Sequence, residues 1–257
     1  MPSRSSVDST PLIQAIGLTH DFIVFGGLIR ALSDVALTVM PGDAVFVLGT
    51  NGSGKTTLMK ALAGEIVCRK GQVQMVGQSL HRLPWSHRTK ILGRLSQRPQ
   101  DNLCSTFTLD EMINLYHSNR IFSSAVKQLK EEMRNAGMSH TQRIGDLSGG
   151  QQQLLALRLV LSREPNLMLL DEPTSSLDFA HTELFVSILK DAIRPGSDRG
   201  LVYISHRVEE AIDLASKIIF LHSGKIIGQW DRGFFPTVSQ FYQMYSQPHR
   251  DYLGERK

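Results

Sequence analysis

The chain has 257 residues, of which 41% are hydrophobic and 20% charged, a composition typical of a globular protein rather than a disordered or fibrous one. Its formal net charge of +4 comes from scattered basic residues, so no nucleic-acid partner is expected. No apolar run reaches the roughly 18 residues of a membrane span, and the polar segment Met1–Pro11 lacks the apolar core of a signal peptide, which predicts a cytoplasmic location.

Short segments rich in Val, Ile and Leu, bounded by turn residues, predict β-strands in both halves of the chain. In chain order they are Leu12–Leu18, Val35–Val39, Ala44–Leu48, Val73–Val76, Leu167–Leu170, Leu201–Ile204 and Ile218–Leu221. Two of them, Leu167–Leu170 and Leu201–Ile204, are continuously apolar, as expected of strands buried on both faces of a parallel sheet.

The middle of the chain, over about residues 101–146, has a helical pattern. Thr108 and Glu111 fit a capping box that opens a helix running through Tyr116. The segment Ser123–Ala136 carries apolar residues at near-helical spacing. We therefore expect an α-helical insert inside an α/β core.

A glycine-rich segment after the strand Ala44–Leu48 predicts a phosphate-binding loop, because residues 49–56 fit the pattern G-x-x-x-x-G-K-[ST]. Glycines allow positive φ, so successive backbone N–H groups can point at one anion. The helix that follows adds the positive end of its dipole. The residues expected to contact the nucleotide are Gly49, Thr50, Asn51, Gly52, Ser53, Gly54, Lys55, Thr56 and Thr57.

Within this loop, Lys55 is expected on the β- and γ-phosphates, and the Thr56 hydroxyl is expected to bind Mg²⁺. The strand Leu167–Leu170 leads directly into Asp171 and Glu172, which places both carboxylates at the sheet edge where ligands bind in open α/β folds. Asp171 is expected to hold Mg²⁺, and Glu172 to act as general base on the attacking water. The predicted cofactors are ATP and Mg²⁺.

Between these two motifs lies Leu147–Gln151, followed by a run with helical periodicity, Gln152–Ser162. A Ser-Gly-Gly turn at a helix N-terminus is a second anion site. One ATP has one triphosphate, so a second phosphate-binding helix end requires an explanation.

Nearly the whole chain resembles the nucleotide-binding subunits of ABC transporters. Leu147–Gln151 is identical to the LSGGQ signature of that family, and Gln97 matches its Q-loop glutamine. Asp178 lies in a segment similar to the D-loop, and His206 is similar to the switch histidine. The resemblance implies a P-loop NTPase core with a mostly parallel sheet, an N-terminal antiparallel β subdomain and an inserted α-helical subdomain.

Two subunits meet head to tail in this family, which would explain the second anion site. The resemblance implies that Ser148, Gly149, Gly150 and Gln151 of one subunit cover the ATP that the other subunit binds. Asp178 would then link the two subunits, although it also fits an ordinary helix cap.

The family roles of the remaining residues each have a simpler alternative. Gln97 would reach Mg²⁺ and the attacking water, or it is only a polar end of the β-like segment Ile91–Ser96. His206 would contact the γ-phosphate and help to position Glu172, or it is a surface histidine. Phe22 stands where the family places an aromatic ring on adenine; a core aromatic is the alternative, and Phe25 competes for the role.

The resemblance implies one cassette over residues 1–257. The core and β subdomain would occupy about 12–96 and 147–230, and the helical subdomain about 97–146. The C-terminal tail, 231–257, is aromatic-rich and expected to be irregular, with no role assigned from the sequence.

The expected partners are a second cassette subunit, forming a homodimer, integral-membrane permease subunits that dock on the helical insert, and an extracytoplasmic substrate-binding protein. The chain would lie peripherally on the cytoplasmic face of the inner or plasma membrane. A cassette on a chain without membrane spans favours an importer. The alternatives are a soluble ABC ATPase of the cluster-assembly type and a regulatory module without turnover, which the intact Lys55, Asp171 and Glu172 argue against.

Overall fold

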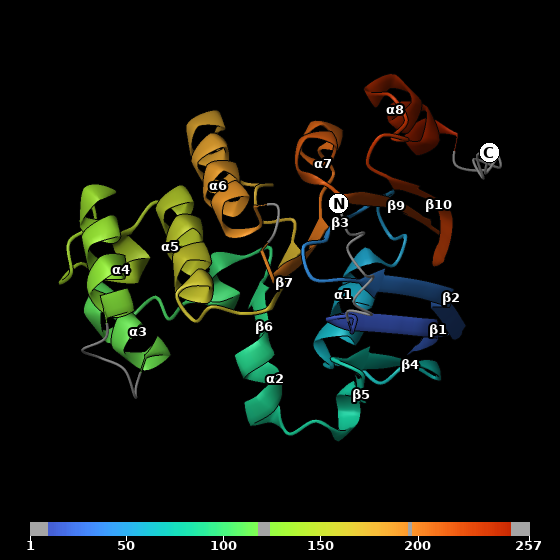
Figure 1. The fold of residues 1–257 in the computed structure, drawn as a ribbon, viewed down its shortest axis with the longest axis horizontal. Coiled ribbons are helices and arrows are strands. Elements are labelled where there is room, and N and C mark those ends of the chain that lie inside the picture. The colour runs from blue at the N-terminus through green and yellow to red at the C-terminus, as the bar shows by residue number, and fades with distance from the viewer. Residues whose placement is uncertain (1–9, 118–123, 195–196, 248–257) are drawn as a thin grey trace, which may run out of the picture.

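The computed structural model of the chain describes residues 10–117, 124–194 and 197–247 and contains two β-sheets with surrounding helices (Figure 1). The first sheet is antiparallel and has the strand order β2-β1-β4-β5. Its strands are β1 (Ile13–Val24), β2 (Gly27–Val39), β4 (Lys70–Met75) and β5 (Gln78–Ser79). The predicted N-terminal antiparallel subdomain is therefore confirmed, although β1 and β2 run further than the sequence pattern indicated.

The second sheet has the order β10-β9-β3-β8-β7-β6 and is parallel except for the antiparallel pair β9 and β10. Its strands are β3 (Ala44–Gly49), β6 (Leu92–Leu95), β7 (Leu167–Asp171), β8 (Gly200–Ile204), β9 (Lys217–His222) and β10 (Lys225–Asp231). Every residue of β7 and β8 is buried, which confirms the expectation drawn from their continuous apolar runs.

The helices are α1 (Lys55–Ala63), α2 (Trp85–Ile91), α3 (Leu109–Tyr116), α4 (Ser124–Asn135), α5 (Gly149–Leu161), α6 (Phe179–Ala192), α7 (Val208–Leu214) and α8 (Val238–Ser246). In Figure 1, α3 to α6 gather to one side of the parallel sheet, whereas α1 lies beside β1 and β2 and α8 lies near β9 and β10. The capping box predicted for α3 is present, with Thr108 and Glu111 bonding reciprocally. The β-like segment predicted from Ile91 starts one residue too early, because Ile91 is the last residue of α2. Ser123, which was expected to open α4, lies outside the described residues. Within the described ranges, no helix has the length and apolar character required to span a membrane.

The parallel sheet separates two hydrophobic clusters, as the alternation along β3 shows. Val45 and Val47 pack with α1 and the antiparallel sheet, whereas Phe46 and Leu48 face the cluster that includes residues of α3 to α8. The Phe46 ring stacks on Tyr203 of β8 with 4.6 Å between the ring centroids. The site-forming ends of β3, β7 and β8 are thus fixed by packing on both faces.

The expectation of an irregular segment after Trp230 is wrong, because it contains α8. Thr237 caps this helix and forms a capping box with Gln240. Phe241 and Met244 are buried, and Phe241 meets the Trp230 ring edge-on at 5.5 Å. Phe241 and Met244 therefore form the buried face of an amphipathic helix, whereas Phe234 and Tyr242 are exposed.

Candidate functional site

The glycine-rich loop between β3 and α1 needs glycine for steric reasons at both of its ends. Gly49 has φ 150° and Gly54 has φ 104°. A Cβ atom on Gly49 would lie 2.1 Å from the Leu221 carbonyl oxygen, and one on Gly54 would lie 2.2 Å from the Ala31 carbonyl oxygen. Helix α1 begins at Lys55, immediately after the loop, so its N-terminal N–H groups face the same space.

A pocket of about 740 Å³ opens beside this loop and gathers most of the predicted site residues. The residues that line it are Phe22, Ile29, Arg30, Ala31, Asn51, Gly52, Ser53, Gly54, Lys55, Thr56, Thr57, Gln97, Glu172 and His206. Phe22 is 40% exposed within it, whereas the competing Phe25 is fully exposed and does not line it. The β1–β2 hairpin also contributes Ile29, Arg30 and Ala31, which the motif patterns did not single out.

Lys55 is buried at the base of this pocket. Its ammonium group donates to the Gly49 carbonyl oxygen at 2.8 Å and to the Thr50 carbonyl oxygen at 3.0 Å. Burial lowers the pKa of Lys55, while the charges of Glu172 and Asp171 act in the opposite direction. The side chain is therefore held close to the loop that would receive phosphates.

Glu172 lies between two of the predicted residues. Its Oε1 is 2.6 Å from His206 Nε2, and its Oε2 accepts a hydrogen bond from Gln97 Nε2 at 3.3 Å. The backbone of Glu172 is left-handed, with φ 47°, and its N–H donates to the Ile204 carbonyl oxygen at 3.0 Å. Such a conformation is strained for a residue with a Cβ atom and requires support from its surroundings.

Asp171 ends β7 and is buried next to Glu172. Burial raises the pKa of Asp171 and Glu172 raises it further, whereas the positive charges of Arg94 and Lys55 lower it. A hydrogen bond with the Thr56 side chain lowers the pKa of Asp171 as well. The carboxylate and the hydroxyl that were predicted as metal ligands therefore meet in the fold.

The donor set fits Mg²⁺. Asp171, Thr56 and Gln97 offer side-chain oxygens, which are the ligands that this hard cation prefers. The described ranges contain no group of three or more His, Cys, Asp or Glu side chains that would hold a metal alone. Mg²⁺ at nucleotide sites usually takes only one or two carboxylates and completes its shell with substrate phosphates and water.

The signature segment does not line this pocket. Ser148 caps α5, accepting from the Gln151 N–H at 3.2 Å, while the Gln151 side chain accepts from the Ser148 N–H at 3.0 Å. Asp178 caps α6 through the N–H of His181 at 2.8 Å, as the simpler alternative for this residue predicted. A Cβ atom on Gly150 would meet the His181 ring at 2.7 Å, so the starts of α5 and α6 lie together.

Two contacts with the glycine-rich loop come from parts of the chain that the motif patterns did not include. Tyr245 of α8 accepts a hydrogen bond from the Gly49 N–H at 3.3 Å, and His222 Nδ1 lies 3.2 Å from Thr50 Oγ1. Burial raises the pKa of Tyr245 to about 12, so its hydroxyl stays protonated. The C-terminal helix therefore supports the start of the loop.

The sequence profile of the family described as ABC transporter matches residues 32–175, a range that holds the loop, Gln97, the signature and Glu172. The chain belongs to the ABC transporter family. A bacterial ABC transporter cassette, solved as a dimer, superposes with a TM-score of 0.74 and is 26% identical, covering 86% of this chain and 100% of that one. The P-loop NTPase fold implied by the sequence is thereby confirmed.

Relatives of this cassette differ in length. The hemin import ATP-binding protein HmuV of Gloeobacter violaceus is 32% identical over 209 residues, which are 76% of this chain and 74% of the relative. A Bacillus cereus protein named as an ABC transporter ATP-binding protein is 30% identical over 236 residues, 84% of this chain but 42% of the relative. The chain thus spans about two fifths of the length of several curated relatives that it matches.

Proposed function

We propose that this chain binds and hydrolyses ATP as the nucleotide-binding subunit of an ABC transporter. The observation that carries the proposal is the position of Glu172, held between His206 and Gln97 on the wall of the pocket that the glycine-rich loop also lines. A cradle for phosphates and a positioned base in one pocket are the two parts that hydrolysis of a phosphoanhydride requires.

The nucleotide would lie along the pocket from Phe22 to the loop. The Phe22 ring would stack on adenine, and the N–H groups of the loop and of α1 would surround the phosphates. Lys55 would exchange its present carbonyl acceptors for phosphate oxygens, which gives charge-assisted and therefore stronger hydrogen bonds.

For hydrolysis, Glu172 would accept a proton from the attacking water, with His206 and Gln97 holding its carboxylate in place. Thr56, Asp171 and Gln97 would hold Mg²⁺, which when bound supplies positive charge to the phosphates. Burial and the charge of Glu172 raise the pKa of Asp171, and a bound cation would favour its ionised form in the same way as the charges of Arg94 and Lys55 do.

We further propose that two copies close head to tail on two ATP molecules. Ser148, Gly149, Gly150 and Gln151 do not line their own pocket, and they present the N-terminus of α5 as an anion-binding end. In such a dimer, Asp178 would link the copies near the start of α6. The related bacterial cassette was solved as a dimer, which supports this arrangement.

Replacing Ser148 with arginine tests this arrangement. The larger cationic side chain would stand against the phosphates of the opposing subunit, so we expect cooperative ATP hydrolysis to fall by at least about tenfold. Binding of a fluorescent ATP analogue to the monomer should be unchanged, because Ser148 lies outside the pocket. Undiminished cooperative hydrolysis would mean that the signature is not used between subunits.

We propose that this chain acts on the cytoplasmic face of a membrane, as its transport role would require. We propose that the helical insert, about 97–146, docks on a separate permease, and that an extracytoplasmic binding protein delivers the substrate. The proposed direction is import, supported by the similarity to HmuV, which is named for hemin import.

Co-purification in mild detergent tests the transport role. The tagged full chain, recovered from its native membranes, should retain a polytopic membrane protein at near one-to-one ratio, as identified by mass spectrometry. An untagged strain serves as control. Recovery with soluble proteins alone would favour the cluster-assembly type of ABC ATPase and leave the ATP chemistry in place.

A further inference from the structure

A second polar cluster is centred on the carboxylate of Glu210 in α7. Glu210 is 9% exposed, and none of its contacts is a residue that lines the nucleotide pocket. Its side chain accepts hydrogen bonds from Thr174, Tyr203, Ser205 and Arg207. Burying a carboxylate costs free energy, and in this fold the hydrogen bonds from these four donors offset that cost.

The donors on Glu210 come from the two segments that carry the candidate catalytic side chains. Thr174 Oγ1 lies 3.0 Å from Glu210 Oε1, and Thr174 follows Glu172 with only Pro173 between them. Ser205 Oγ lies 3.1 Å from Glu210 Oε2, and Ser205 directly precedes His206. One carboxylate therefore ties together the backbone on either side of the Glu172–His206 contact.

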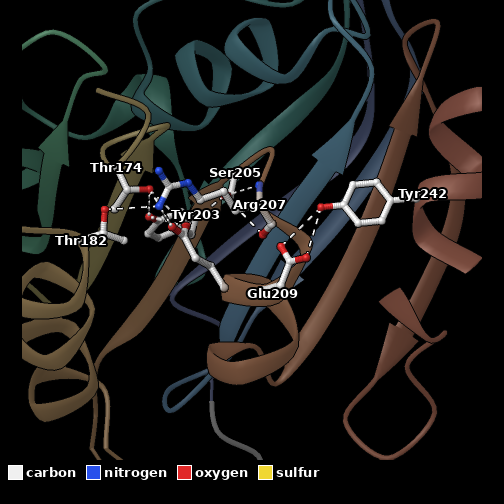
Figure 2. Close-up of polar contacts among 8 residues, drawn as sticks. Thr174, Thr182, Tyr203, Ser205, Arg207, Glu209 and Tyr242 are labelled. Atoms are coloured by element: carbon white, nitrogen blue, oxygen red, sulfur yellow. Dashed lines mark hydrogen bonds and ion pairs between the residues drawn. The ribbon is translucent and has the colours of Figure 1, made fainter. Parts of the chain in front are cut away.

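The other members of the cluster make this tie rigid. Burial and the neighbouring charge of Glu210 raise the pKa of Tyr203 well above its ordinary value, so the phenol remains a donor to Glu210 at 3.1 Å. Arg207 Nη1 lies 3.4 Å from Glu210 Oε1 and also bonds to Thr182 of α6 at 3.3 Å. Figure 2 shows Thr174, Thr182, Tyr203, Ser205 and Arg207 close together.

The backbone of Glu172 supplies the reason why such a tie is needed. Its left-handed conformation, φ 47°, persists only if the surroundings hold it. The N–H of Glu172 is bonded to Ile204 of β8, and Thr174 is held by Glu210, so the strained residue is fixed on both sides. The carbonyl oxygen of Glu172 also accepts a hydrogen bond from the Ser175 N–H at 3.2 Å, and the bond from Thr174 to Glu210 adds the link between this loop and α7.

We propose that Glu210 is a positioning residue for ATP hydrolysis. By binding Thr174 and Ser205, it holds Glu172 and His206 in the relative position that hydrolysis requires. The proposal rests on the function proposed above. Loss of Glu210 is therefore expected to affect the rate of hydrolysis but not ATP binding. The hydrogen bonds of Glu210 reach the segments that carry Glu172 and His206 but not the glycine-rich loop.

Glu210→Gln tests the proposal, because it keeps the side-chain length but places an NH₂ donor where one oxygen accepted hydrogen bonds. Either orientation of the amide sets a donor against donors, which disturbs the cluster. We expect kcat for ATP hydrolysis to fall about tenfold to 100-fold, since small displacements of a catalytic group have effects of this size. The Kd for ATP should change by less than about threefold.

The matched control is Glu209→Gln, the same change one residue earlier on α7. Glu209 is exposed and bonds to Tyr242 of α8 instead of the buried cluster (Figure 2). We expect this variant to keep the kcat of the unchanged chain. Thermal unfolding of both variants, followed by circular dichroism, separates lost positioning from lost folding.

Several outcomes would overturn the proposal. Glu210→Gln with the kcat of the unchanged chain would overturn it directly, as would a fall in kcat fully explained by the unfolded fraction. Should Glu210→Gln not fold, Ser205→Ala removes one donor to the carboxylate and is expected to lower kcat about threefold to tenfold at constant Kd; an unchanged kcat there overturns it too. If the unchanged chain does not hydrolyse ATP, the proposed function itself fails.

Discussion

ATP hydrolysis by the full chain is expected to fall by at least about 100-fold when Glu172 is replaced with glutamine, because a positioned general base contributes roughly that much or more. The amide cannot accept the proton of the attacking water. ATP binding should remain within about threefold, since the loop and Lys55 are untouched. A fluorescent ATP analogue measures binding, and phosphate release measures turnover.

The same variant also reports on dimer formation. With the cradle intact and hydrolysis blocked, Mg²⁺-ATP should hold Glu172→Gln as a dimer, which size-exclusion chromatography detects. Glu131→Gln is the matched control, an identical change at an exposed position of α4, and should keep both normal turnover and normal dissociation. A Glu172→Gln chain that stays monomeric with ATP would count against head-to-tail closure, and one with normal turnover would remove Glu172 as the base.

Loss of the Lys55 side chain should act on binding. We expect Lys55→Ala to raise the Kd for ATP at least about 30-fold, because truncating one partner of a buried charged contact typically costs about 2 kcal/mol or more. Turnover at any practical ATP concentration should fall with it. Isothermal titration with ATP gives the Kd, and the fold is checked by circular dichroism.

Lys60→Ala provides the comparison for this change. Lys60 lies on the same helix, α1, but its side chain is exposed and outside the pocket. Its loss should leave the Kd for ATP unchanged. Wild-type hydrolysis by Lys55→Ala would contradict the assignment of the loop as a phosphate cradle.

The sequence was sufficient to predict the core strands of the parallel sheet and the motif residues that meet in the pocket, although not Ile29, Arg30 and Ala31 of the β1–β2 hairpin. The strands β7 and β8 are recognisable because a strand covered on both faces needs apolar residues at every position. The loop after β3 is recognisable because close backbone contacts leave room only for glycine at Gly49 and Gly54. Such local constraints appear directly in the order of the residues.

Two features of the fold were not predicted, the helix α8 and the polar cluster around Glu210. The helix α8 was missed although Thr237 and Gln240 form a capping box and Phe241, Met244 and Tyr245 share a face. The polar cluster around Glu210 left no sign in the sequence, because Thr174 and Ser205 contact Glu210 only once the segments that follow β7 and β8 have packed against α7. Asp178 forms the helix cap that the simpler interpretation predicted, and its role between subunits stays a prediction.

The bond from the Gly49 N–H to the Tyr245 hydroxyl joins groups 196 positions apart in the chain. A ribosome releases β3 and its loop early, but α8 is among the last described segments to emerge. A nascent chain that ends at α7 would carry every nucleotide motif and still lack this support for the loop. The nucleotide cradle is therefore complete only once α8 has emerged, and a stop codon between positions 207 and 245 would remove that support while leaving every motif intact.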